Sequence, residues 1–214
     1  MTTTRLSPVV LGLLCIAVTI ACGCESVTSR HDVEVNWLVD QTAVKTVGVT
    51  GFTWSPAKAA APTGWSFSQG GDDTGLNAAN FVTGALMKMN RYDLRERAQL
   101  AKVVEEQGLQ LSDLVAKGDY ERIGKLTGVD AVIVGNVLSC AMAMKDQPGM
   151  SVAVIDVAFG CRCVSTKTGS VLWSMGGSKS ITFAQKLSPW MGMLTEELVA
   201  ELREKLAHPP PSAK

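Results

Sequence analysis

Three cysteines in the second half of the chain have the type and spacing to bind a metal ion. Cys161 and Cys163 are separated by one residue, and Cys140 lies in the segment before them. A zinc site needs four suitably spaced ligands. The only two histidines, His31 and His208, lie near the chain ends, and no second cysteine pair completes a tetrahedral site. Packing in an apolar interior therefore explains these cysteines better, and we expect no metal ion and no cofactor.

Two further motifs could perform chemistry, and neither indicates an enzyme. Glu105 and Glu106 are adjacent acids, but neighbouring residues on a helix point about 100° apart and do not converge on one substrate. The run GGDD at residues 70–73 precedes an expected helix, as phosphate-binding loops do, but it lacks their lysine and hydroxyl residue. Serine, histidine and aspartate show no nucleophile-elbow context. We therefore expect no catalytic residue and no small-molecule substrate.

Residues 1–24 have the organisation of a bacterial lipoprotein signal peptide. One basic residue precedes an apolar run over residues 9–20, which is too short to span a bilayer and has the length of a secretory core. The following TIACGC is similar to a lipobox, in which a small residue precedes a cysteine that becomes lipidated. Cys22 is the preferred lipidation site and Cys24 the alternative. An ordinary signal peptide or a short buried helix would be the other interpretations.

The residue that follows the lipidated cysteine indicates which membrane retains a bacterial lipoprotein. That residue is Gly23 or Glu25, and neither is the aspartate associated with retention in the inner membrane. We therefore expect a lipid anchor in the outer membrane, with the protein facing the periplasm. This compartment is oxidising and permits disulfides. Because Cys140, Cys161 and Cys163 cannot all pair with one another, at least one should be a free, buried thiol.

The composition suits one globular domain. The 214 residues include 20 basic and 20 acidic side chains and are 46% hydrophobic. The balanced charge argues against nucleic-acid binding, which needs clustered lysine and arginine. The hydrophobic content can form a core. We expect a tether over residues 25–45, one domain over residues 46–207, and a disordered tail over residues 208–214.

Apolar periodicity predicts a mixed sheet covered by helices. Strands are expected at residues 46–53, 92–95, 131–142, 151–164 and 171–175, and helices at residues 72–90, 98–107, 120–127 and 190–206. Residues 54–71 are rich in proline, glycine and serine and are expected to form a loop, with a further turn at residues 145–149. The alternation from Ala153 to Cys163 places both of the closely spaced cysteines on an apolar face. The order predicts an α/β (α+β) sandwich, with about four to five strands and about four helices.

The centre of the chain carries the residues that resemble a known family. RYDLRER at residues 91–97 is followed by AQLAKVVEEQGLQLSDLV and IGKLTGVDAVIVGNV, and STKTGSVLWS and SKSI lie downstream. Together they are similar to the CsgG-like family of curli-secretion components, over about residues 45–183. The resemblance implies an α/β fold that is related to the penicillin-binding-protein activator LpoB and to the N-terminal domain of TolB. The fold alone does not establish the function.

The chain departs from that family where the secretion channel lends two β-hairpins to a membrane barrel. A membrane strand needs roughly 9–11 residues. Here about residues 141–151 occupy the first insertion position, and AQKLSP, between Phe183 and Trp190, occupies the second. We therefore expect this protein to have no transmembrane hairpins of its own.

Five residues are predicted to contact other proteins. Trp54, Trp65 and Phe67 lie in the expected loop and could form an exposed aromatic patch, or could fold over a sheet edge instead. Glu96 and Arg97 could form an ion pair that closes the junction between a strand and a helix. The family resemblance suggests a subunit contact at the same position.

These observations predict a non-enzymatic envelope lipoprotein that acts as an accessory protein in secretion or envelope assembly, through protein partners or self-association. One alternative is an LpoB-like regulator of a cell-wall synthase, whose reach would be limited because residues 25–45 span at most about 70 Å. The other alternative is a subunit of an oligomeric outer-membrane secretion channel, which would need membrane hairpins.

Overall fold

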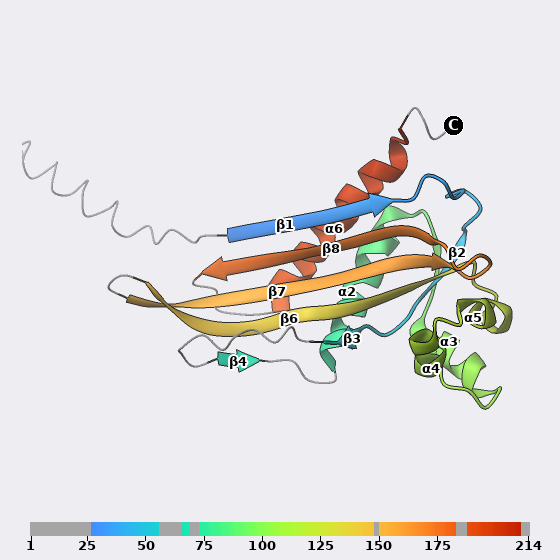
Figure 1. Cartoon of the computed structure of the whole chain (residues 1–214), viewed down its shortest axis with the longest axis horizontal. Helices are drawn as coiled ribbons and strands as arrows, with labels where there is room; N and C mark the ends of the chain where they lie inside the picture. The colour runs from blue at the N-terminus through green and yellow to red at the C-terminus, as the bar shows by residue number, and fades with distance from the viewer. Residues whose placement is uncertain (1–26, 56–65, 69–72, 148–149, 183–187, 211–214) are drawn as a thin grey trace, which may run out of the picture.

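The computed structural model describes residues 27–55, 66–68, 73–147, 150–182 and 188–210, which form one mixed sheet and five helices (Figure 1). The strands are β1 (Val27–Val35), β2 (Thr46–Val49), β3 (Thr53–Trp54), β4 (Ser66–Ser68), β5 (Asp93–Arg95), β6 (Ala131–Gln147), β7 (Met150–Ser165) and β8 (Val171–Thr182). The helices are α2 (Asp73–Met89), α3 (Arg97–Glu105), α4 (Leu111–Lys117), α5 (Tyr120–Thr127) and α6 (Ser188–Ala207).

The sheet has eight strands, and its main order is β1-β8-β7-β6-β2-β5. Each of β1, β8, β7 and β6 runs antiparallel to the next in this order, whereas β2 runs parallel to both β6 and β5. The short strands β3 and β4 also pair with β6, beyond the end of β2. The long antiparallel part is therefore bordered by β1 at one edge.

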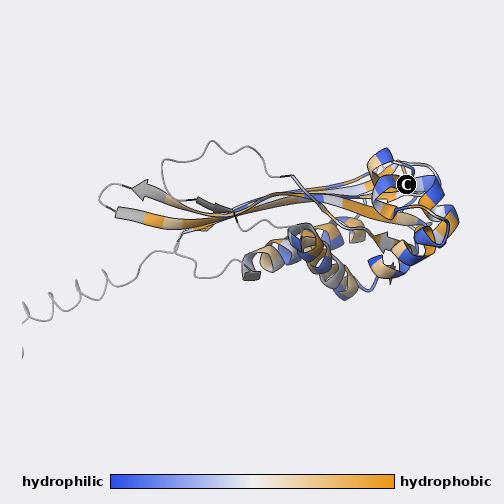
Figure 2. Cartoon of the chain, turned by 90° about the horizontal axis from the view of Figure 1, so that it is seen from below, coloured by the Kyte–Doolittle hydropathy of each residue, from blue (hydrophilic) through white to orange (hydrophobic). Residues whose placement is uncertain are grey.

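The two faces of the sheet are covered differently. Helices α2 and α6 pack on one face, which we call the helix-covered face. The leucines of α6 at positions 194, 198, 202 and 206 are buried there. A second core cluster lies between α3, α4, α5 and one end of the opposite face. Figure 2 shows α2 and α6 on one side of the sheet. The rest of the opposite face, which we call the open face, carries no described helix.

Local signals set the ends of helix α5. Asp119 precedes the helix, and its carboxylate accepts a hydrogen bond from the backbone N–H of Arg122 at 3.3 Å. Gly128 ends the helix with a positive φ of 71°, which glycine adopts at low cost. The predicted limits of this helix are confirmed.

The expected tether is wrong over residues 27–35. These residues form β1, which pairs with β8 from Val27 opposite Ile181 to Val35 opposite Trp173. Only Val33 of this strand is buried, because β1 is an edge strand with polar side chains on its outer positions. The periodic apolar signal of a strand is therefore nearly absent, although the backbone is fully paired on one side.

The structure also differs from the sequence-based expectation in the length of some strands and in the number of strands and helices. The fold class is confirmed, but β3 and β4 lie within the expected loop, and α4 was not predicted. The strands β6 and β8 continue to Gln147 and Thr182, because pairing with β7 and β1 satisfies their backbone groups beyond the predicted ends.

Candidate functional site

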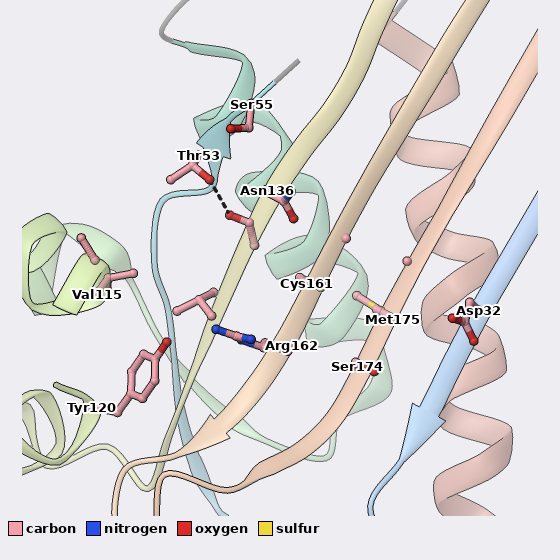
Figure 3. A pocket seen from close by; sticks show the side chains of 15 residues that line it. Asp32, Thr53, Ser55, Val115, Tyr120, Asn136, Cys161, Arg162, Ser174 and Met175 are labelled. Carbon is pink, nitrogen blue, oxygen red and sulfur yellow. Dashed lines mark hydrogen bonds between the residues drawn. The ribbon is translucent and has the colours of Figure 1, made fainter. Parts of the chain in front are cut away.

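A cleft lies on the open face, between the sheet and helices α4 and α5 (Figure 3). Its volume is about 620 Å³. Strands β1, β6, β7 and β8 and the segment around β3 supply the floor and one wall, and the two helices supply the other wall. The side chains that reach it are Asp32, Thr53, Ser55, Val115, Ala116, Tyr120, Val134, Asn136, Arg162, Ser174 and Met175.

Two paired glycines form the floor of the cleft. Gly160 of β7 lies opposite Gly176 of β8. A Cβ atom built on Gly160 would come no closer than 3.7 Å to another group, and one on Gly176 no closer than 3.5 Å. Internal packing therefore does not require glycine at either position. Glycine weakens a strand interior and often marks a place where another backbone approaches closely.

Two neighbouring glycines show the opposite situation. A Cβ atom on Gly135 would lie 2.7 Å from a ring carbon of Phe52, and one on Gly177 would lie 2.7 Å from the carbonyl oxygen of Arg30. These two glycines are explained by crowding inside the protein. Crowding inside the protein does not explain Gly160 and Gly176 on the open face. Their lack of side chains leaves room for another group to approach the floor of the cleft.

Unpaired charges flank this floor. The register places Asp32 beside Gly176, and it places Arg162 and Glu34 on either side of Ser174 in the next row. Residues paired across strands share a face of the sheet. Asp32, Glu34 and Arg162 are all exposed, and none of them forms an ion pair with another described residue.

A second group of polar side chains lies on the helix-covered face. Nζ of Lys179 is 2.5 Å from Oε1 of Glu197, and Oε2 of Glu197 is 3.0 Å from Nε2 of His31. Burial tends to raise the pKa of Glu197, but its hydrogen bond to Lys179, the lysine charge and His31 outweigh this and lower the pKa. Ser29 Oγ also approaches Nε2 of His31, at 3.0 Å. Serine and glutamate therefore meet the same ring nitrogen, whereas a catalytic triad uses both nitrogens of the histidine.

The cysteines are placed as packing residues. Cys140, Cys161 and Cys163 are buried free thiols. Burial raises the pKa of Cys161 and of Cys163 far above the ordinary value of 9.0. Such thiols stay protonated and are poor nucleophiles and metal ligands. Within the described ranges, no group of three or more His, Cys, Asp and Glu residues could hold a metal ion.

Two of the three predicted aromatic residues lie in described strands. Trp54 is partly buried against the main core, at the edge where β3 pairs with β6. Phe67 lies in β4, opposite Met142 of β6. Trp65 lies outside the described residues. A role for these three residues in binding stays a prediction.

Glu96 and Arg97 do not form the ion pair that the sequence suggested. Both side chains are exposed, and Glu96 precedes α3 without a side-chain capping bond. The guanidinium of Arg97 lies over Gly51, where a built Cβ atom would come within 3.2 Å of its Nε. Arg97 also lines a smaller cleft of about 240 Å³ beside the first one. Their role in protein contacts stays a prediction.

Sequence reasoning missed the open-face residues. Asp32 was assigned to the tether, Gly160 and Arg162 were assigned to a strand without a role, and Gly176 lay just beyond the end of an expected strand. The available signal was two glycines within otherwise β-forming segments. Their pairing depends on the register of β7 and β8, which the sequence does not reveal. The lipidation candidates Cys22 and Cys24 lie outside the described residues.

The sequence was also compared with protein families. The model of the family described as curli production assembly/transport component CsgG matches residues 40–201. No curated protein matches the chain. None of the described helices is long and apolar enough to cross a membrane.

Three solved structures show similar folds. Lipoprotein GNA1162 from Neisseria meningitidis is 19% identical, with a TM-score of 0.51, and the match covers 75% of this chain and 99% of that one. The PelC dodecamer from Paraburkholderia phytofirmans is 15% identical, with a TM-score of 0.50, and the match covers 83% and 98%. The LpoB C-terminal domain from Escherichia coli is 15% identical, with a TM-score of 0.40, and the match covers 65% and 86%.

Proposed function

Because the chain belongs to the CsgG family, we propose that it is a non-enzymatic accessory lipoprotein of the bacterial envelope, which works by binding protein partners or further copies of itself. The observation that carries this proposal is the match of the family model over residues 40–201. The lipobox-like cysteines precede the matched region directly. In this proposal Cys22, or Cys24 as the alternative, carries the lipid.

The position of β1 supports a short connection to the membrane. The first described strand begins at Val27, three residues after Cys24 and five after Cys22. An extended chain covers at most about 3.6 Å per residue, so the sheet would start within about 11 to 18 Å of a lipid on either cysteine. The domain would therefore lie close to the bilayer and would not reach far from it.

One end of the sheet would then face the bilayer. Val27 lies in the same row as Ile181 and Ile155, and β7 begins five residues before Ile155, at Met150. The paired ends of β6 and β7 thus extend beyond the start of β1, by about 17 Å at the usual rise per residue. This end would be the nearest part of the domain to the lipid.

Similar folds are compatible with this role. Lipoprotein GNA1162 has one of these similar folds, and the subunit of the PelC dodecamer has another. We propose self-association for this chain on the same basis. No described residue favours the regulator of a cell-wall synthase, and the short connection after the cysteines removes the long reach that such a regulator would use. No described residue favours a channel subunit over an accessory protein.

The anchor is tested with cysteine variants of the full chain in a bacterium with two membranes. The native chain should incorporate labelled palmitate and sediment with the outer membrane in a density gradient. The double variant Cys22→Ala/Cys24→Ala should incorporate no palmitate and should no longer sediment with the outer membrane. Cys140→Ala is the matched control and should behave as the native chain. Label that persists in the double variant, or sedimentation with the inner membrane, would contradict the proposal.

A further inference from the structure

The open face carries opposite charges in an arrangement that is complementary to itself. Glu34 of β1, Ser174 of β8 and Arg162 of β7 form one row across three strands. The acid and the base are thus two strand spacings apart, about 9.6 Å, with a small residue midway between them. Neither charge has a partner among the described residues.

Small residues occupy the strand between these charges. The positions of β8 that face outward are Ser174, Gly176, Ser178 and Ser180, and all are partly exposed. Gly160 and Ala158 continue this low surface on β7. No side chain along β8 would keep a second sheet away, and two sheets pack with their mean strand directions within about 30° of each other.

From this arrangement we infer that two copies of the chain pack open face to open face, around a two-fold axis that runs along β8. This inference rests on the self-association included in the proposed function. In a two-fold contact each surface meets its own copy, so residue i touches residue j and residue j touches residue i. An axis along β8 places Arg162 of each copy against Glu34 of the other, with Asp32 in the adjacent row.

The shape of the cleft agrees with this packing. With the axis over β8, strand β1 of the second copy lies above β7 of the first. Strand β1 is the edge of its sheet, so it fits beside helices α4 and α5, in the space that forms the cleft. The floor beneath it includes Gly160, where a Cβ atom would meet no close neighbour of its own chain. The second copy accounts for the two glycines that internal packing leaves unexplained.

The direction of the axis is also compatible with two lipid anchors. A two-fold axis along the strands keeps the strands of both copies running the same way. Both β1 strands therefore begin at the same end of the pair, and both connections to Cys22 or Cys24 point to one membrane. An axis across the strands would place the two anchors at opposite ends, which the short connections could not bring to one bilayer.

A charge-swap experiment tests the contact. The full chain is purified in detergent, and its protein mass is measured by light scattering over a range of concentrations. The native chain should form dimers, or assemblies built from dimers. Arg162→Glu places acids against acids and should weaken the dimer about tenfold or more, and Glu34→Arg should do the same. The double variant restores opposite charges at both contacts and should recover the dimer.

Matched controls separate the contact from general effects of charge. Arg203→Glu on α6 and Glu106→Arg at the end of α3 change exposed, unpaired charges elsewhere, and should leave the mass unchanged. Gly176→Val should keep the thermal midpoint and lose the dimer, because its Cβ atom would make only ordinary van der Waals contacts in the monomer, 3.5 Å or more from the nearest atom. A dimer that persists in Arg162→Glu, or a double variant that fails to recover it, would overturn the inference and leave the lipoprotein proposal intact. A monomeric native chain would overturn self-association as well.

Cross-linking in intact cells gives an independent test. Ser174 lies close to the proposed axis, so a cysteine at this position should face its own copy. Ser174→Cys should give a covalent dimer with a short bis-maleimide reagent, whereas Asn77→Cys, on the outer side of α2, should not. Equal cross-linking at both positions would argue against the open-face contact. The buried cysteines of the native chain should not react.

Discussion

The ammonium group of Lys179 lies 2.5 Å from Oε1 of Glu197, and the lysine side chain is only 4% exposed. This pair joins β8 to α6. The second carboxylate oxygen of Glu197 meets His31 and thereby ties α6 to the edge strand β1 as well. A buried cation with a single acidic partner makes the attachment of α6 depend strongly on that partner.

Glu197→Gln should therefore lower the free energy of unfolding by about 2 kcal/mol or more, because it leaves a buried ammonium without a counter-charge. Lys179→Met combined with Glu197→Leu should recover most of the loss, since no buried charge remains. Urea unfolding measures both. The control is Glu196→Gln, whose partner Lys88 is 70% exposed, and it should cost less than about 0.5 kcal/mol. Equal costs for the two neighbouring glutamates would contradict the expectation.

Stability should fall in acid because of Asp130. The backbone N–H of Thr46 donates to its carboxylate and lowers the pKa, burial opposes this, and the N–H of Lys45 and the charge of Lys167 add to the lowering. A folded-state pKa below the ordinary 3.8 means that the stabilisation is present above that pH and is lost as the pH falls through it. Glu197, with its lowered pKa, acts in the same direction.

The measurement is the thermal midpoint between about pH 6 and pH 3. Asp130→Asn should lower the midpoint at neutral pH and make the acid decline shallower. Asp113→Asn, which changes an exposed acid on α4, should leave the decline as in the native chain. An equally steep decline in Asp130→Asn would show that this carboxylate does not contribute.

The buried thiols should make the fold sensitive to alkali. Burial raises the pKa of Cys161 and Cys163 above 9.0 in the folded state. Their contribution is complete below pH 9.0 and is lost as the pH rises further, because only the unfolded chain then releases the protons. Replacing both with alanine should flatten the decline of the thermal midpoint above that pH. Maleimide should label these thiols only after unfolding, and rapid labelling of the native protein would contradict their burial.

Two glycines of helix α2 should respond oppositely to alanine. A Cβ atom on Gly75 would lie 1.9 Å from the carbonyl oxygen of Phe52, a backbone atom that cannot move aside cheaply. Gly75→Ala should therefore destabilise the fold by about 2 kcal/mol or more. Gly84 has nothing within 4 Å of a built Cβ atom, and Gly84→Ala should stabilise the helix by about 0.5–1 kcal/mol. Urea unfolding of both variants checks the pair, and the same sign in both would refute the explanation.

Sequence-based prediction succeeded where the signal was local. The helix expected at residues 120–127 coincides with α5, and the helix expected at residues 190–206 lies within α6. It failed for β1, because a polar edge strand buries only Val33 and pairs with residues about 150 positions away. It ended β8 too early because Gly176 and Gly177 weaken the strand signal, although β8 is paired on both sides in the structure.

The sequence by itself determined the α/β class and the family, because these follow from periodicity and short motifs, and its leader with two candidate cysteines stays a prediction. Only the tertiary structure decided that residues 27–35 belong to the sheet, and that Glu34, Ser174 and Arg162 share one row of its open face. Those relationships depend on strand register between segments far apart in the chain. Register is set by pairing and packing across the whole sheet, and a shift of one residue would place every side chain on the other face.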